Sequence, residues 1–208
     1  MEIYFVRHGQ TGGNEAKRHQ SEDSHLTPLG KKQAKRVAEK IKPLQPTQVL
    51  VSDRVRAIET AQAIAQATDL IPQVDEMFTE LCRPKRLYGF HHKSLQSIWY
   101  IYLWYRGKVG EEGCSTEGES YNHFFNRIKK AQRFLESQPA DSRIVVVSHS
   151  IFINFFVAHL QSDTPMSFIR ALLIFTKILR IRNGSITRLQ FEDTPDQRFQ
   201  WQILSFGE

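Results

Sequence analysis

Apolar residues along the chain follow two alternating patterns. Short segments at 2–6, 48–51 and 143–147 each have one polar residue followed by a continuous apolar run, as in strands that are buried on both faces. Between these runs, apolar residues recur every three or four positions, which is the spacing of an amphipathic helix. Strands that alternate with such helices predict an α/β fold, in which a mostly parallel central sheet lies between two layers of helices.

The ends of the predicted helices are also marked. Thr27 and Pro28 form a helix start, because threonine is a good N-cap and proline is favoured at the first helical position. Pro43 ends this helix. Apolar stripes predict a second helix around 57–65, a long helix over Glu119–Gln138 and a last one over Ile151–Leu160.

The residues after 170 favour antiparallel strands. Asn183-Gly184 is typical of a tight two-residue turn, so Ala171–Ile181 and Ser185–Phe191 are predicted to form a hairpin. Trp201–Phe206 is predicted as a final strand. An edge strand in this part of the chain would allow two copies to pair as a homodimer.

Residues 70–118 do not follow the alternation. Pro72, Pro84 and Gly89 interrupt them, and a glycine-containing stretch at 107–118 ends them. The aromatic run at 98–105 predicts one helix, packed in the core or placed as a lid over a substrate. We therefore expect residues 1–208 to form a single domain, with an insertion on its substrate side at about 80–118.

Composition limits the classes of protein that fit. Of 208 residues, 40% are hydrophobic and the net charge is +6, so the chain can bury a core and attracts anions. No apolar run reaches the roughly 18 residues of a membrane span, and the first residues lack a signal-peptide pattern. Basic residues are spread along the chain, which favours small anions over nucleic acid. Two cysteines make no disulfide framework, so a reducing, cytoplasmic location is expected.

Reactive residues follow all three predicted strands. Arg7-His8-Gly9-Gln10-Thr11 follows the first strand, Ser52–Arg56 the second, and Ser148-His149-Ser150 the third. Because ligands bind beyond the carboxyl ends of parallel strands, these segments are expected to share one site. Arginine forks match phosphate oxygens, and a neutral imidazole is a nucleophile that accepts a phosphoryl group. Phosphoryl chemistry is therefore predicted at this edge of the sheet.

The same segments resemble a known family. Arg7–Thr11 with Asn14 is similar to the signature of the histidine phosphatase superfamily, in the branch of cofactor-dependent phosphoglycerate mutases and related phosphatases. The resemblance continues in the family's order through four further segments: Leu26–Gly30, Ser52–Ala61, Gly118–Ser120 and Val145–His149. It covers roughly residues 1–160 and implies a phosphoglycerate mutase-like three-layer fold.

The resemblance also implies roles for individual residues. His8 would be the nucleophile that becomes phosphohistidine, and Glu80 the general acid. The phosphoryl group would be held by Arg7, Arg56 and His149, with Thr11 and Asn14 supporting the pocket. Ser150 replaces the family's usual glycine, and would either narrow the pocket or donate its hydroxyl to the phosphate. The implied partners are a small phosphorylated substrate and inorganic phosphate, with no metal, cofactor, nucleic acid or membrane.

Several alternatives remain open at this stage. Many family members carry a Gly-x-Trp-Glu-Gly segment where this chain has Leu87–His92, and mutases are usually longer, which favours a phosphatase. The rival functions are mutase-type phosphotransfer and non-catalytic binding of a phosphorylated ligand. The rival acids to Glu80 are Glu22, Asp23 and Asp53.

The insertion contains further polar residues. His91 and His92 are expected to be exposed or partly buried rather than metal ligands, because no carboxylate or cysteine motif accompanies them. Some basic residues here are candidates to attract a second anionic group of the substrate: Arg83, Lys85, Arg86, Lys93 and Arg106. Arg86 is the one whose charge reversal we would expect to raise KM for substrates with two anionic groups.

Overall fold

The computed structural model describes residues 1–114, 116–161, 181–192 and 201–208. Within these residues, one sheet has the strand order β3-β2-β4-β1-β5-β6. The strands are β1 Glu2–Arg7, β2 Gln48–Val51, β3 Gln73–Val74, β4 Arg143–Ser148, β5 Ile186–Phe191 and β6 Trp201–Ser205. β3, β2, β4 and β1 pair in parallel, whereas β5 and β6 are antiparallel additions at the β1 edge. The predicted mostly parallel sheet is confirmed.

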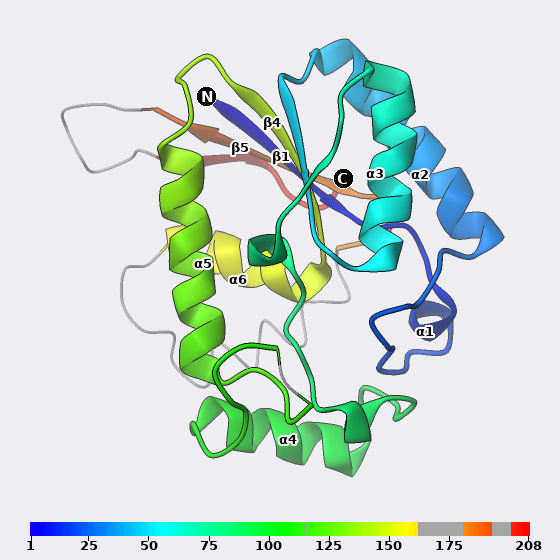
Figure 1. Ribbon diagram of the computed structural model, residues 1–208, viewed down its shortest axis with the longest axis vertical. Coiled ribbons are helices and arrows are strands. Elements are labelled where there is room, and N and C mark those ends of the chain that lie inside the picture. Colours follow the sequence, from blue (N-terminus) through cyan, green and yellow to red (C-terminus); the bar gives the residue numbers. More distant parts are fainter. Residues whose placement is uncertain (115, 162–180, 193–200) are drawn as a thin grey trace.

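Helices cover both faces of the sheet (Figure 1). α2 Pro28–Ile41 and α3 Val55–Thr68 lie on one face, and α5 Tyr121–Glu136 and α6 Ser150–Leu160 lie on the other. α4 Leu95–Tyr105 lies apart from the sheet at one end of the molecule. The short elements are α1 Gly12–Glu15 and the 3-10 turns η1 Lys42–Leu44, η2 Glu76–Phe78 and η3 Lys85–Leu87.

Successive side chains of the central strands point to opposite faces of the sheet and pack into two separate hydrophobic cores. On β1, Ile3 and Phe5 pack with the α5 and α6 side, whereas Tyr4 and Val6 pack with α2 and α3. Side chains of a strand point to opposite faces in turn, so an uninterrupted apolar run is what a sheet covered on both faces requires. The three-layer α/β/α arrangement predicted from the sequence is therefore confirmed.

Most predicted element ends lie within a residue or two of the observed ones. The Thr27 side chain accepts a hydrogen bond from the Gly30 amide at 3.0 Å, as a helix N-cap should. The long helix begins at Tyr121 instead of Glu119, because Ser120 provides the cap by accepting from the His123 amide. β3 was not predicted, since two exposed residues carry no periodic pattern.

The carboxyl-terminal prediction is confirmed in part. Arg182 and Ser185 close a turn around Asn183-Gly184, and Gly184 has a φ of 71°. β5 follows this turn and pairs with β1 and β6. The first arm of the predicted hairpin lies largely at 171–180, outside the described residues. β6 is an edge strand, and pairing of two chains through it stays a prediction.

The two cysteines correct an expectation. Cys82 and Cys114 form a disulfide, with Cα atoms 5.4 Å apart across a separation of 32 residues. Counting cysteines excluded a framework of several bridges, but it could not show that two distant loops meet. The reducing, cytoplasmic location was inferred from cysteines that were expected to be unpaired. Because they are bridged, they no longer support that inference. Among the described helices, none is long and apolar enough to cross a membrane.

Two glycines set how closely the loop after β1 approaches α2. A Cβ added at Gly9 would lie 2.4 Å from the Gly30 carbonyl oxygen, and one at Gly30 would lie 2.1 Å from the Gln10 oxygen. Gln10 also accepts from the Thr27 amide at 2.9 Å and donates to Gln33 at 2.8 Å. The loop that begins at His8 is thus packed backbone to backbone on the first turn of α2.

We expect Gly30→Ala to destabilise the protein by about 1–3 kcal/mol, because the new methyl group overpacks against backbone atoms that cannot move freely. Gly12→Ala is the matched control, since a Cβ there meets nothing within 4 Å. Denaturant unfolding of both variants and the wild type measures the effect. Equal stability of the two variants would contradict this account of the close approach.

Candidate active site

The carboxyl ends of β1 and β4 bring two histidines together. Arg7 lies beside Ser148 in the parallel register, and His8 and His149 are the next residues. The His8 amide donates to the Ser148 carbonyl at 3.1 Å, and the two imidazole centroids are 5.1 Å apart. Both side chains are buried. The meeting of strand ends expected from the sequence is therefore present.

One ring nitrogen of His8 is held by the backbone, and no hydrogen bond to the other is present among the described residues. Nδ1 lies 2.7 Å from the Gly9 carbonyl oxygen. Because a carbonyl only accepts, Nδ1 carries the proton and Nε2 keeps its lone pair. Burial, followed by the charges of Arg56 and Arg7, lowers the pKa of His8 well below 6.5. The imidazole is neutral at pH 7, with an unprotonated nitrogen suited to nucleophilic attack.

His149 is oriented by the end of β2. Its Nε2 lies 2.8 Å from Ser52 Oγ, and its Nδ1 is buried without a hydrogen-bond partner among the described residues. Burial, followed by the charge of Arg56, lowers the pKa of His149 well below 6.5. A buried polar atom without a partner is costly, so Nδ1 is a group that a ligand would satisfy.

Arg7 and Arg56 are anchored beside these rings. Arg7 Nη1 donates to the Ile181 carbonyl, and Arg56 Nη1 donates to the Ser21 carbonyl at 3.1 Å. Each Nε is buried without a partner in the described part of the chain. Burial lowers the pKa of each guanidinium to about 10, so both remain charged at pH 7. Each guanidinium is fixed by one backbone carbonyl and keeps N–H donors that no described residue accepts. The pair is therefore suited to binding an anion.

Glu80 occupies the start of α6. Its carboxylate accepts hydrogen bonds from the amides of Ile151 at 3.2 Å and Phe152 at 3.1 Å, in the helix that begins directly after His149. Burial lowers the pKa of Arg7 and of Arg56, and the negative charge of Glu80 acts in the opposite direction by raising both. The predicted acid therefore lies with the histidines and arginines.

The rival carboxylates are engaged differently. Glu22 pairs with Arg54 at 3.1 Å, and Asp53 accepts from the Thr79 hydroxyl. Asp23 is exposed. Their surroundings favour Glu80 over all three as the acid.

Thr11 and Asn14 bond mainly to the loop that carries them. Together they form the capping box of α1, and Thr11 also donates to Gln20. Asn14 Oδ1 accepts from Asn183 at 3.0 Å, and the same amide group reaches the His8 carbonyl at 3.0 Å. Ser150 is buried at the first position of α6, directly after His149. Direct phosphate contacts of these three side chains stay predictions.

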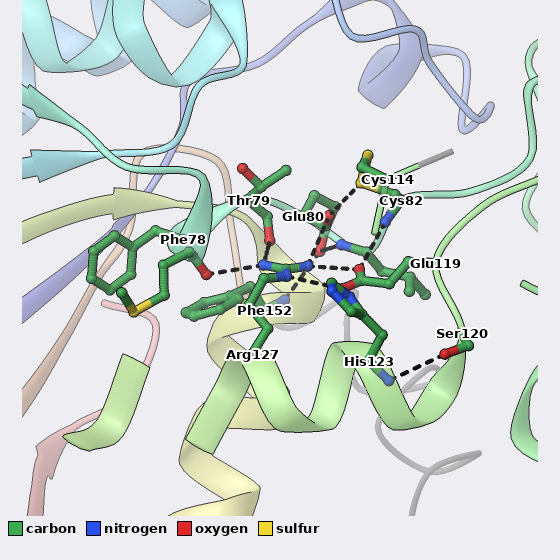
Figure 2. Close-up of polar contacts among 12 residues, drawn as sticks. Phe78, Thr79, Glu80, Cys82, Cys114, Glu119, Ser120, His123, Arg127 and Phe152 are labelled. Carbon is green, nitrogen blue, oxygen red and sulfur yellow. Dashed lines mark hydrogen bonds and ion pairs between the residues drawn. A yellow bond between two sulfur atoms is a disulfide. The ribbon is translucent and has the colours of Figure 1, made fainter. Parts of the chain in front are cut away.

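A buried ion pair between Arg127 on α5 and Glu119 just before this helix holds the segment that carries Glu80 (Figure 2). Arg127 binds both carboxylate oxygens of Glu119, at 2.9 and 2.7 Å. The same guanidinium donates to the backbone carbonyls of Met77 and Thr79, at 3.0 and 2.6 Å. Glu119 accepts from the Cys82 amide at 3.4 Å and from His123 at 2.7 Å. The Arg127–Glu119 pair therefore holds the backbone on both sides of Glu80.

Several of these supporting residues were not predicted. Ser52 follows the second strand, so its position near the histidines could have been inferred from the fold. No local pattern marks the contacts of Arg127 and Asn183 with the site, because their partners lie about 50 and 175 residues away.

Two other features do not mark the reactive site. A cavity of about 310 Å³ lies between η3 and α4, lined by Arg86, Trp99, Tyr100 and others, and it contains none of the residues predicted for the phosphoryl chemistry. His92 lies against His19, with ring centroids 4.6 Å apart. Among the described residues, no group of three or more metal-ligating side chains is assembled.

Comparisons with known proteins agree with this geometry. Residues 3–203 match the family described as the histidine phosphatase superfamily, branch 1. A probable phosphoglycerate mutase GpmB from Erwinia tasmaniensis is 30% identical over 212 residues, covering 100% of this chain and 93% of that protein.

Solved structures are similar in fold. A putative alpha-ribazole-5'-P phosphatase from Escherichia coli has a TM-score of 0.77 at 21% identity, covering 100% of this chain and 97% of that one. A mycobacterial glucosyl-3-phosphoglycerate phosphatase in complex with VO3 has a TM-score of 0.72 at 24% identity, covering 99% of this chain and 98% of that one.

The buried histidines predict a loss of stability in mild acid. His8 and His149 have folded pKa values below the unfolded value of 6.5, and burial followed by the charge of Arg83 lowers the pKa of His19 to about 2. Below pH 6.5 the unfolded chain binds more protons, so the free energy of unfolding falls as pH falls. Each fully buried histidine contributes at most about 1.4 kcal/mol per pH unit.

Thermal unfolding between pH 8 and pH 5, in a buffer without phosphate, measures this dependence. We expect a midpoint that is nearly constant above pH 7 and falls steadily below 6.5. The variant His149→Asn should show a shallower fall. A midpoint that rises on acidification would contradict the proposed neutral state of these rings.

We expect Arg127→Met to lower the free energy of unfolding by about 3 kcal/mol, because it leaves the buried Glu119 carboxylate without its main partner. The double variant Arg127→Met/Glu119→Gln should recover part of this loss, since the amide carries no charge. Urea unfolding of both variants tests the interpretation. A double variant less stable than Arg127→Met would show that the ion pair is not the source of the effect.

Proposed function

Because this chain belongs to the histidine phosphatase superfamily, we propose that it hydrolyses phosphomonoesters through a phosphohistidine on His8. The observation that carries the proposal is the state of His8. Its Nδ1 proton is held by the Gly9 carbonyl, its Nε2 has no hydrogen bond to any described residue, and the ring is kept neutral beside two charged arginines. A neutral nucleophile and fixed cations around the phosphoryl group are what phosphoryl transfer requires.

The first step transfers the phosphoryl group to the enzyme. The His8 Nε2 lone pair attacks phosphorus, and the bond from phosphorus to the leaving oxygen breaks. Arg7, Arg56 and the Nδ1 side of His149 bind the phosphoryl oxygens, where negative charge is spread in the transition state. Glu80, which takes up a proton when the anionic substrate binds, donates it to the leaving alkoxide, which departs as an alcohol. The Gly9 carbonyl accepts from Nδ1 while the ring carries the phosphoryl group.

The second step returns the enzyme to its starting state. A water oxygen attacks phosphorus, the bond between phosphorus and Nε2 breaks, and Glu80 takes a proton from the water. Inorganic phosphate leaves, and both His8 and Glu80 regain their initial protonation. In this proposal Arg7 and Arg56 supply the positive charge and the neutral His149 supplies a hydrogen bond, so no metal or other cofactor takes part.

Mutase-type phosphotransfer is the second candidate. Its support is the 30% identity to a probable phosphoglycerate mutase over the whole chain. In that case the phosphohistidine passes its phosphoryl group back to a bound substrate instead of water. A requirement for a bisphosphate primer, with little release of phosphate, distinguishes this activity. Phosphate binding without any turnover would instead indicate a non-catalytic binding protein.

The test of the proposed function is a hydrolysis panel of alkyl phosphates, sugar phosphates and p-nitrophenyl phosphate. We expect wild-type turnover with chelator present, and His8→Asn should reduce kcat on the order of 10⁶-fold, as for other covalent nucleophiles. Turnover with a labelled substrate should leave an alkali-stable, acid-labile label on the wild type only. Unchanged kcat in His8→Asn would refute the phosphohistidine.

Glu80→Gln is the companion variant in the same panel. A lost general acid costs about 10²- to 10⁴-fold on alkyl phosphates. The loss should be much smaller on p-nitrophenyl phosphate, whose leaving group departs without a proton. Equal losses on both substrates would remove Glu80 from the acid role.

A further inference from the structure

His149 contacts Ser52 through one ring nitrogen and has the other available for a ligand. Burial lowers its pKa well below 6.5, so at pH 7 the ring is neutral and carries a single N–H proton. Its Nδ1 is buried without a hydrogen-bond partner among the described residues. With the proton on Nδ1 this atom is a donor to an anion, whereas with the proton on Nε2 it presents a lone pair that repels one. The position of the proton therefore decides whether His149 can bind a phosphoryl oxygen.

The Ser52 hydroxyl is the partner of the other nitrogen. Its Oγ lies 2.8 Å from His149 Nε2. Both residues have an exposed fraction of 0%, so bulk water does not compete for this contact. A hydroxyl group can either accept from an imidazole nitrogen or donate to it. The remaining contacts of Ser52 decide which of the two occurs.

Those contacts leave the hydroxyl proton of Ser52 one acceptor at a normal distance. Its Oγ accepts from the Arg54 amide at 3.3 Å. The other side-chain oxygens within reach in the described residues are Asp53 Oδ1 at 3.3 Å and Thr79 Oγ1 at 3.4 Å. Hydroxyl donors approach oxygen acceptors to roughly 2.5–3.0 Å, so both of these contacts are long. If Ser52 accepted from His149, its own proton would be left without a good acceptor in a buried region, which is costly.

Asp53 already receives a proton donor from another residue. The Thr79 hydroxyl donates to Asp53 Oδ1. Thr79 directly precedes Glu80, so this bond also joins the segment of the proposed acid to the end of β2. The carboxylate is thus engaged by Thr79, and the Ser52 proton is left for His149.

The backbone sets the position of Ser52 relative to the ring. Ser52 follows β2 directly, and its amide donates to the Val147 carbonyl of β4 at 3.0 Å. Val51 lies beside Val147 in the parallel register of the two strands. His149 is the first residue after β4. Because paired strands hold both groups, little conformational freedom is lost when they bond.

We propose that Ser52 is a positioning residue: it donates to Nε2 and so holds His149 in the tautomer with its proton on Nδ1. In this form His149 donates to an oxygen of the phosphoryl group, whose placement rests on the proposed function. Ser52 takes no part in making or breaking bonds to phosphorus. The two rings then share one tautomer but differ in what they offer. His8, held at Nδ1 by the Gly9 carbonyl, offers a lone pair on Nε2, whereas His149, held at Nε2, offers an N–H donor on Nδ1.

The tautomer is measured by ¹⁵N–¹H correlation NMR at pH 7, without phosphate, on histidine-labelled wild type, Ser52→Ala and Ser148→Ala. Signals that disappear in His149→Asn identify the ring. We expect a protonated Nδ1 and an unprotonated Nε2 in the wild type, and a shift toward the Nε2-protonated form in Ser52→Ala. Ser148→Ala is the matched control, because it removes a buried hydroxyl next to His149 that donates to the Phe78 carbonyl at 2.6 Å instead of to the ring. Its spectrum for His149 should match that of the wild type.

Binding of inorganic phosphate, measured by calorimetry, is the second readout. The affinity should fall about tenfold in Ser52→Ala, as for the loss of one hydrogen bond to a charged group. Ser148→Ala should bind phosphate as the wild type does. A wild-type ring protonated on Nε2 overturns the proposal, and so does a His149 tautomer that Ser52→Ala leaves unchanged. Equal losses of affinity in the two serine variants would assign the effect to packing and would also overturn it.

Neither measurement requires turnover, so this proposal and the proposed function can fail separately. Absence of hydrolysis in the substrate panel would refute the proposed function and leave the measured tautomer of His149 as it is. A phosphatase that depends on His8 but has its His149 proton on Nε2 would keep the proposed function and refute the role of Ser52.

Discussion

The parallel pairing of β1 with β4 is the constraint on which the site depends. It places Arg7 beside Ser148, and hence His8 beside His149. A slip of one residue would move every side chain of β1 to the opposite face. Two different cores cover those faces, so their packing holds the register. A slipped register would expose apolar side chains from both cores, and this free-energy cost keeps the two imidazoles next to each other.

Charge balance explains how the buried cations are tolerated. The charge of Glu80 acts on Arg7, Arg56 and Arg83 at once. Its carboxylate also accepts from the first amides of α6. One carboxylate cannot neutralise three guanidiniums, so the site keeps an excess of positive charge in a region of low dielectric. Such a region attracts multiply charged anions more strongly than a surface patch does. Under the proposed function, this remaining positive charge is what a phosphorylated ligand would meet.

The support of Glu80 comes from α5, on the far side of the sheet from α2 and α3. Arg127 and Glu119 bind the backbone at Met77, Thr79 and Cys82, and the disulfide joins this segment to the loop before α5 (Figure 2). Buried polar networks of this kind specify one arrangement, because each member is costly to leave unpaired. The proposed acid therefore lies on a part of the chain whose position is set by long-range contacts.

Local pattern determined the central strands β1, β2 and β4, the helix start at Thr27, and the delivery of His8, His149 and Arg56 to one edge of the sheet. These follow from periodicity, capping and the direction of parallel strands, which act over a few residues. Only the tertiary structure decided that Cys82 meets Cys114, that Arg127 holds the Glu80 segment, and that Gly9 packs on Gly30. It also decided that Arg86, which the sequence favoured for a second anionic group, is paired with Glu117. Contacts between residues tens of positions apart depend on how each loop closes, and no local pattern encodes that closure.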